Sequence, residues 1–247
     1  MTKKRVSLIA ICVIILLSLF LLYWFYFQEP QAFPADEQLV DQINEIFPKA
    51  DAETIQENIQ LDQEHVFVPF LSSENNYGAS YWVWERNKWK PSYIDTTGEP
   101  TVWKIDKEDP SSFHLVWNLH PDDQISYADF YLIRDRGYHI SNGEHTYVPR
   151  IQLEDSVALE EESYGVLQLP EDWRSFMTQT NKLALAQNPH VNFTSLLPDV
   201  HAYIGWTPFN EDNEITYPDN SVNGHGYING DINTDFVRII EEAELEK

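Results

Sequence analysis

The chain begins with a long apolar run. Val6–Phe27 contains no charged residue, and Lys3, Lys4 and Arg5 precede it. A helix of about 20 apolar residues, rising about 1.5 Å per residue, spans the roughly 30 Å hydrocarbon core of a membrane. Lys49 is the next cation along the chain. This bias in lysine and arginine predicts a cytoplasmic N-terminus and an extracytoplasmic C-terminal part.

A cleaved signal peptide is the alternative interpretation of this run. Signal peptides have an apolar core of about 7–15 residues that ends at small residues. This run is longer, and it leads into "YWFYFQEPQAFPA", which has no A-x-A-like site. The pattern favours an uncleaved anchor, and whether the anchor is ever cleaved stays open. The expected division is a cytoplasmic N-terminus (1–5), a transmembrane anchor (6–27), a linker (28–34) and one extracytoplasmic domain (35–247).

Beyond the linker, the spacing of apolar residues is first typical of helices, then alternates as in strands, and then becomes helical again. Aromatic and β-branched residues alternate with polar ones from His65 to about residue 157, and turn signals recur roughly every 10 residues. That spacing favours antiparallel strands over βαβ units, and "VHAYIGW" (200–206) adds a late strand. Apolar residues at helical spacing predict helices over 35–47, 51–60, 170–187 and 234–247. We therefore predict an α+β fold: a transmembrane helix, then one mainly antiparallel β domain with flanking helices.

Charge narrows the range of partners. The chain has 40 acidic and 16 cationic residues, and every acidic residue follows Phe27. Such a negative domain repels nucleic acid and favours cations or basic partners, although the same charge also keeps an exported domain soluble. We expect no nucleic-acid partner. The expected contacts are the membrane, through residues 6–27, and a protein or envelope-polymer partner.

Cysteine usage limits the chemistry of the exterior part. Cys12 is the single cysteine and lies within the predicted anchor. The exterior domain therefore has neither a disulfide nor a thiol nucleophile. A disulfide-free domain behind an uncleaved anchor is typical of a bacterial cell-surface protein. The chain also lacks a G-x-S-x-G motif, so it carries no sign of a serine hydrolase.

One stretch resembles a calcium loop in part. In "YPDNSVNGHGYINGDINTDF" (217–236), Asp219, Ser221 and Asn223 alternate before Gly224, as at positions 1, 3, 5 and 6 of an EF-hand loop. Position 12 should be a bidentate acid, but Asp231 arrives one residue late. Asn-Gly pairs at 223–224 and 229–230 are also turn signals. The sequence favours ordinary turns, with a calcium site at these four side chains as the alternative and no other cofactor expected.

Aromatic residues on the predicted strands give a second candidate site. Trp82 and Trp84 share one face of a strand. Exposed, they would form an aromatic surface for a ligand; buried, they would build the core, which the size of each ring favours. The histidines match no zinc spacing, as neither His114 with His120 nor His139 with His145 has a metal-site pattern.

These observations lead to two functional hypotheses. The first is a single-pass, membrane-anchored extracytoplasmic binding or interaction protein, motivated by the anchor and by the absence of a recognisable catalytic motif. The alternative is an envelope enzyme that acts on glycan with a pair of carboxylates, which must lie about 5–9.5 Å apart. Sequence alone does not select two carboxylates among 40. The two hypotheses differ in structure, because an enzyme requires converging carboxylates in a pocket.

Overall fold

The computed structural model describes residues 11–20, 23, 29–141, 143–159, 162–187 and 202–246. Residues 11–20 are helical. Within the described part of the chain, no helix is both long enough and apolar enough to cross a membrane. Much of the predicted span Val6–Phe27 lies outside the described residues, as does the N-terminus before it. The anchor therefore stays a prediction.

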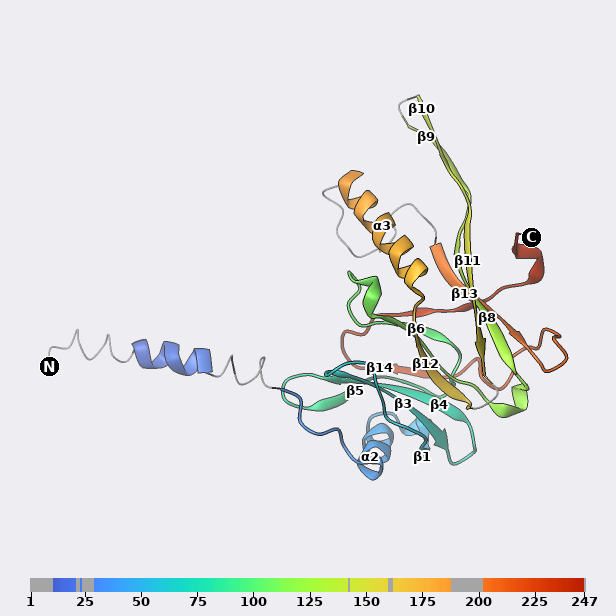
Figure 1. The fold of residues 1–247 in the computed structure, drawn as a ribbon. Coiled ribbons are helices and arrows are strands. Elements are labelled where there is room, and N and C mark those ends of the chain that lie inside the picture. The colour runs from blue at the N-terminus through green and yellow to red at the C-terminus, as the bar shows by residue number, and fades with distance from the viewer. Residues whose placement is uncertain are drawn as a thin grey trace.

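Three stacked β-sheets form the body of the protein (Figure 1). The first sheet has the order β1-β3-β4-β5-β14, with β2 also paired to β3. Its strands are β1 (Ala52–Ile55), β2 (Ile59–Gln60), β3 (His65–Ser72), β4 (Tyr77–Trp84), β5 (Trp89–Asp95) and β14 (Gly226–Ile228). The helix α2 (Asp36–Ile46) packs on this sheet through Leu39 and Ile43.

The middle and third sheets have four strands each. The middle sheet contains β12 (Tyr164–Gln168), β7 (Phe113–Asn118), β6 (Thr101–Lys104) and β15 (Thr234–Phe236). The third sheet contains β11 (Ile151–Ala158), β8 (Tyr127–Arg134), β13 (Ala202–Phe209) and β16 (Arg238–Ile239). Among the described strands, β13 and β16 pair in parallel and the other pairs are antiparallel. The predicted α+β class with a mainly antiparallel sheet is confirmed.

Alternating side chains explain why the layers stack. On β3, Val66, Val68 and Phe70 join the core beneath α2, whereas Phe67 joins the core between the first and middle sheets. Successive strand residues point to opposite faces of the sheet. A strand that is covered on both faces therefore needs apolar residues at both odd and even positions. This explains the nearly continuous apolar sequence of β3, "HVFVPF".

The largest core cluster lies between the middle and third sheets. Val102 of β6 and Trp117 of β7 meet Phe130 and Trp206 of the third sheet in this core. Helix α3 (Glu171–Gln187) covers one end of it with Trp173, which is fully buried. The strands and helix that bury these rings fix the position of the third sheet on the body.

A buried amide links the first and middle sheets. Asn118, at the end of β7, is fully buried and donates hydrogen bonds to the Gln56 side chain at 2.7 Å and to the Gly78 carbonyl at 2.7 Å. Its side-chain oxygen accepts from Ser163 Oγ at 3.2 Å. Buried polar groups of this kind must be satisfied, so Asn118 fixes how the two sheets meet.

Two predicted helices are strands in the structure. Residues 51–60 form β1 and β2, because Asp51 takes a left-handed φ of 46° and Asn44 holds both backbone groups of Ala52. Residues 234–246 form β15, β16 and a short 3-10 turn, η4 (Glu242–Glu244), in place of the terminal helix. Pairing with exposed strand edges outweighs local helical spacing in both places. The other 3-10 turns are η1 (Pro48–Ala50), η2 (Pro110–Ser112) and η3 (Pro121–Asp123).

Candidate interaction site

A two-stranded ribbon projects from the third sheet (Figure 1). It consists of β9 (Gly137–Ser141) and β10 (Glu144–Val148), which pair with each other and form a sheet of their own. β8 leads into β9 and β10 leads into β11, so the ribbon extends a hairpin of the third sheet. Among the described strands, none pairs with β9 or β10 from outside the ribbon, and an isolated two-stranded hairpin is only marginally stable in water.

Large side chains line one face of this ribbon. Tyr138 lies directly opposite Tyr147, and Ile140 lies directly opposite His145. Opposite residues share a face, and so do residues two apart on a strand, so all four side chains lie together. Tyr138, Ile140 and Tyr147 are 61%, 58% and 63% exposed. We call these four side chains the ribbon face.

The base of the ribbon consists of residues 134–136 and 149–152, and we call this base the elbow. Arginine side chains support it. On its inner side, Arg134 donates to the Pro149 carbonyl at 3.1 Å, and its guanidinium lies 5.1 Å from the centre of the Phe176 ring on α3. Phe176 belongs to the predicted apolar face of α3, of which Trp173 is buried while Leu183 is 64% exposed. α3 therefore packs firmly at its start and supports the elbow from within.

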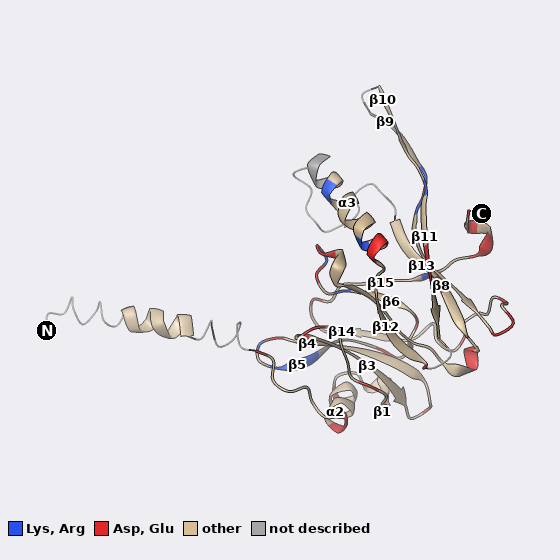
Figure 2. Ribbon diagram, in the orientation of Figure 1, with Lys and Arg blue, Asp and Glu red and all other residues tan. Residues whose placement is uncertain are grey.

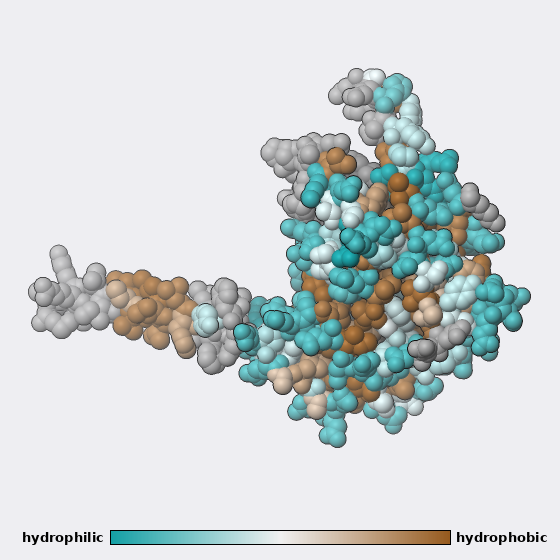
Figure 3. All heavy atoms as spheres, viewed as in Figure 1, coloured by the Kyte–Doolittle hydropathy of each residue, from teal (hydrophilic) through white to brown (hydrophobic). Residues whose placement is uncertain are grey.

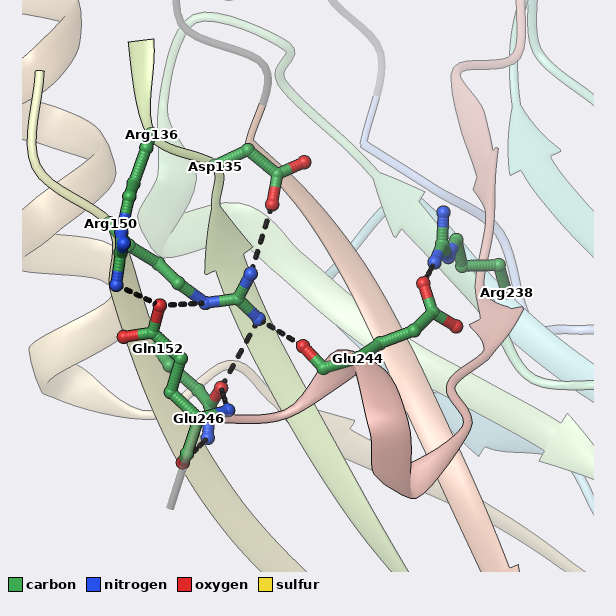
Figure 4. A network of polar contacts seen from close by, with 7 residues as sticks. All are labelled: Asp135, Arg136, Arg150, Gln152, Arg238, Glu244 and Glu246. Carbon is green, nitrogen blue, oxygen red and sulfur yellow. Dashed lines mark hydrogen bonds and ion pairs between the residues drawn. The ribbon is translucent and has the colours of Figure 1, made fainter.

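Arg150 is the central residue on the outer side of the elbow (Figure 4). Its side chain is 14% exposed, and it forms an ion pair with Asp135 at 3.2 Å. It also donates to Gln152 Oε1 at 3.3 Å and to the backbone carbonyl of Glu244 at 2.7 Å. A planar guanidinium has five donors in a fixed arrangement, so one arginine can join two strands and the C-terminal segment at once.

The C-terminal segment lies across the elbow. Glu246 forms an ion pair with Arg136, and its backbone N–H donates to Gln152 Oε1 at 3.0 Å. The Gln152 amide donates in turn to the Glu246 carbonyl at 3.3 Å. Leu245 packs against the outer core cluster of the third sheet, and Glu244 pairs with Arg238. Figure 2 shows basic residues along the base of the ribbon, with acidic residues prominent over much of the body.

The predicted calcium residues do not form one compact loop. Asp219 and Ser221 lie in a turn, Asn223 has a left-handed φ of 64°, and β14 separates them from Asp231. Ser221 is fully buried, and its hydroxyl donates to Asp123 Oδ2 at 2.5 Å. Within the described residues, no group of three His, Cys, Asp or Glu side chains is placed to hold a metal. The hydroxyl of Ser221 thus has a structural partner, and the calcium site stays an untested alternative to the ordinary turns that the sequence favours.

Ser221 and Asp123 also lie near His120 without forming a catalytic triad. The backbone N–H of His120, and not its ring, donates to Ser221 Oγ at 2.8 Å. The ring Nδ1 instead accepts from the Asp122 N–H at 3.1 Å. A nucleophilic serine requires a base at its hydroxyl proton, which Asp123 binds here. These contacts stabilise the loop after β13.

The tryptophans that were candidates for an exposed surface belong to the core. Trp82 is fully buried and Trp84 is 8% exposed. Both point from β4 towards α2, where Phe33 meets the Trp82 ring edge-on at 5.8 Å. The aromatic ligand surface predicted at these two residues is therefore absent, because α2 and the linker cover that face. Core packing, the alternative interpretation, describes them correctly.

Glu99 has a raised pKa but lines none of the three cavities described for this protein. Burial raises the pKa of Glu99 from 4.5 to about 7, and the neighbouring Asp95 adds to this effect. Tyr93 donates to Asp95 Oδ2 at 2.5 Å. Cavities of about 300, 590 and 630 Å³ occur among the described residues, and neither carboxylate lines any of the three. An enzyme site combines a perturbed acid with a concave pocket, and these features lie apart here.

Comparisons with protein families, curated proteins and solved structures give no match. The ribbon itself was not identified from the sequence, although "HTYVPRIQL" was assigned to a strand. Asn142-Gly143 between two alternating segments is a strong hairpin signal and marks this turn in the sequence. Periodicity does not show that a hairpin stands clear of the body, because that depends on which strands cover it.

Proposed function

We propose that this protein is a membrane-anchored extracytoplasmic interaction protein that binds a partner protein through the ribbon face. The observation that supports it most directly is the gathering of Tyr138, Ile140 and Tyr147 on one exposed face of a projecting ribbon. Aromatic side chains are common anchors of protein interfaces, and clustered exposed apolar residues mark binding surfaces. The edges of a ribbon also offer free backbone groups for an added strand.

The anchor and orientation belong to this proposal. The uncharged run Val6–Phe27, preceded by three cations, supports a single span with the N-terminus in the cytoplasm and the β domain outside. A reporter fused after Lys247 that works only outside the cytoplasm should be active. An inactive reporter on a stably produced fusion would contradict the orientation.

A photo-cross-linking experiment tests the binding role. A benzoylphenylalanine is placed at position 138 or 147 of the full chain in its native membrane. The matched control carries it at Tyr217, which is 58% exposed. Its neighbour Thr216 binds the Pro208 carbonyl, which lies at the end of β13 opposite the ribbon. We expect one discrete protein adduct from both ribbon positions and none of that mass from position 217. The same adducts from all three positions, or none from the ribbon, would contradict the proposal.

The enzymatic alternative gains little from the structure. Glu99 has the raised pKa of a general acid, but neither Glu99 nor Asp95 lines any of the three cavities described above. A glycan chain requires a groove between its two catalytic carboxylates. We therefore favour binding over catalysis as the function of the exterior domain.

A further inference from the structure

We propose that the elbow is a binding site for an acidic peptide, which residues 242–246 occupy here as an internal ligand. The partner at the ribbon face would present a segment of the same chemistry: carboxylates on either side of an apolar side chain. The part that concerns the partner rests on the proposed function. The peptide-binding property of the elbow does not, and it is tested separately.

We call residues 242–246 the tail. The tail contacts the elbow through backbone and side-chain groups, as a bound peptide does. Arg150 binds the backbone carbonyl of Glu244, and Gln152 binds both backbone groups of Glu246. Side-chain charges add to these backbone contacts through Arg136 at one end. Leu245 supplies the apolar contact between the two glutamates. Backbone pairing provides affinity, while charged and apolar side chains provide selectivity.

The tail is held mainly by polar contacts, and most of its residues are exposed to solvent. Residues 241–244 and Glu246 are exposed, and Leu245 is half-buried. η4 is a single 3-10 turn, so the tail has no extended secondary structure to hold it in place. Segments with few buried apolar contacts open at low free-energy cost. A competing peptide can therefore replace the tail without unfolding the third sheet.

The tail also leaves one hydrogen-bond donor of Arg150, its Nε–H, unused. The Arg150 Nε–H is buried, and none of the described residues accepts a hydrogen bond from it. The carboxylate oxygen of Glu246 that lies near it is 3.9 Å away, which is too far for a hydrogen bond. Carboxylates bind guanidinium best with two parallel hydrogen bonds. A peptide that places its carboxylate at this nitrogen would gain a contact that the tail lacks.

The charge of the rest of the molecule makes this site distinctive. The chain has a formal net charge of −24, yet three of its seven arginines, Arg136, Arg150 and Arg238, contact the tail. An acidic peptide is repelled by most of the surface and attracted to this face. The attraction decreases with salt, since the Debye length is about 10 Å at 0.1 M and about 3 Å at 1 M.

The test uses a fluorescein-labelled peptide with the sequence of residues 240–247, IEEAELEK. Binding is measured by anisotropy to the full chain in lipid nanodiscs, with and without residues 242–247. A tethered tail acts at an effective concentration of about millimolar and competes with the added peptide. We expect the truncated protein to bind at least tenfold more tightly than the intact chain, and binding to weaken as salt increases.

Two controls make the result specific. Arg150→Lys in the truncated protein should weaken binding at least tenfold, because lysine cannot form the paired hydrogen bonds of a guanidinium. Arg86→Lys, at an exposed arginine on the turn after β4, should leave binding unchanged. A peptide with glutamine at the positions of Glu244 and Glu246 should not bind.

Several results would overturn the proposal. A truncated protein that melts cooperatively but does not bind the peptide would do so, as would binding that is insensitive to Arg150→Lys. If truncation prevents folding, the full chain with Glu244→Gln and Glu246→Gln keeps the tail volume and should still bind more peptide than the native chain. Equal binding by the two would contradict the inference.

The role of the partner has a separate readout. Excess peptide should reduce the cross-link from position 138 in the truncated protein. An undiminished cross-link, with peptide bound, would contradict an acidic partner segment at the elbow while leaving the ribbon-binding proposal intact. Peptide binding without any cross-link would refute the ribbon-binding function and leave the elbow as a peptide site.

Discussion

Glu99 should make the folded domain less stable as the pH rises. This residue lies between β5 and β6, and its pKa rises from 4.5 to about 7 because of burial and then the charge of Asp95. Between these two values the folded state binds more protons than the unfolded state. The free energy of unfolding therefore decreases from about pH 4.5 to about pH 7. The full contribution of Glu99 is present below this range and lost above it.

The size of the effect follows from the pKa. A shift of one pKa unit corresponds to about 1.4 kcal/mol. The difference between 4.5 and about 7 therefore gives an upper bound of about 3.4 kcal/mol for the change in the free energy of unfolding. The side chain is partly exposed, and water screens its repulsion from Asp95. After this reduction we expect about 1–2 kcal/mol, which is large against the total stability of a domain of this size.

The substitution Glu99→Gln tests this reasoning. Glutamine keeps the shape of a protonated glutamate and removes the titration. In urea unfolding of residues 30–247, the variant should nearly equal the native protein at about pH 4 and exceed it by about 1–2 kcal/mol at about pH 8. Glu74→Gln, on an exposed turn, should show no such difference. A variant that is less stable than the native protein at pH 8 would show that the ionised carboxylate is stabilised where it lies.

Three further results are expected. Asn118→Ala should lower the free energy of unfolding by about 2–4 kcal/mol in urea titrations, because it leaves buried partners unsatisfied; a loss below about 1 kcal/mol would contradict the link between the sheets. The double substitution Tyr138→Ser and Tyr147→Ser should change it by less than about 0.5 kcal/mol, since a larger loss would mean that the ribbon face packs on the body. Thermal melts should not shift with millimolar calcium relative to magnesium, because Ser221 already donates to Asp123; a calcium-specific rise of several degrees would contradict this.

Sequence patterns predicted the strands better than their surroundings. The period-two pattern that begins at His65 indicated strands, and β3 to β8 are strands within that region. Period two does not reveal which sheet a strand joins or what covers each face. For this reason Trp82 was open to an exposed interpretation until α2 was seen to cover it. The order of the layers is a tertiary property that local spacing does not determine.

The C-terminal segment shows the same limit more clearly. Phe236, Ile239 and Ile240 fit one helical face, yet Val237 and Ile240 are buried and Phe236 is 63% exposed. β16 completes the edge of the third sheet by pairing with β13, and this pairing outweighs the helical spacing. The tail then reaches the elbow, so the missed strand also concealed the candidate peptide site.

The order of the layers also separates the linker from the ribbon. Phe33 in the linker packs edge-on against Trp89 at 4.9 Å, and the Trp89 ring N–H donates to the Gln31 carbonyl at 2.9 Å. The linker is thus bound to the first sheet, while the ribbon extends from the third sheet beyond the middle one (Figure 1). Figure 3 shows polar residues around the visible face of this body and hydrophobic residues near its centre. The segment that would join the proposed anchor to the domain and the proposed binding surface therefore lie on different layers of the domain, with the middle sheet between those layers.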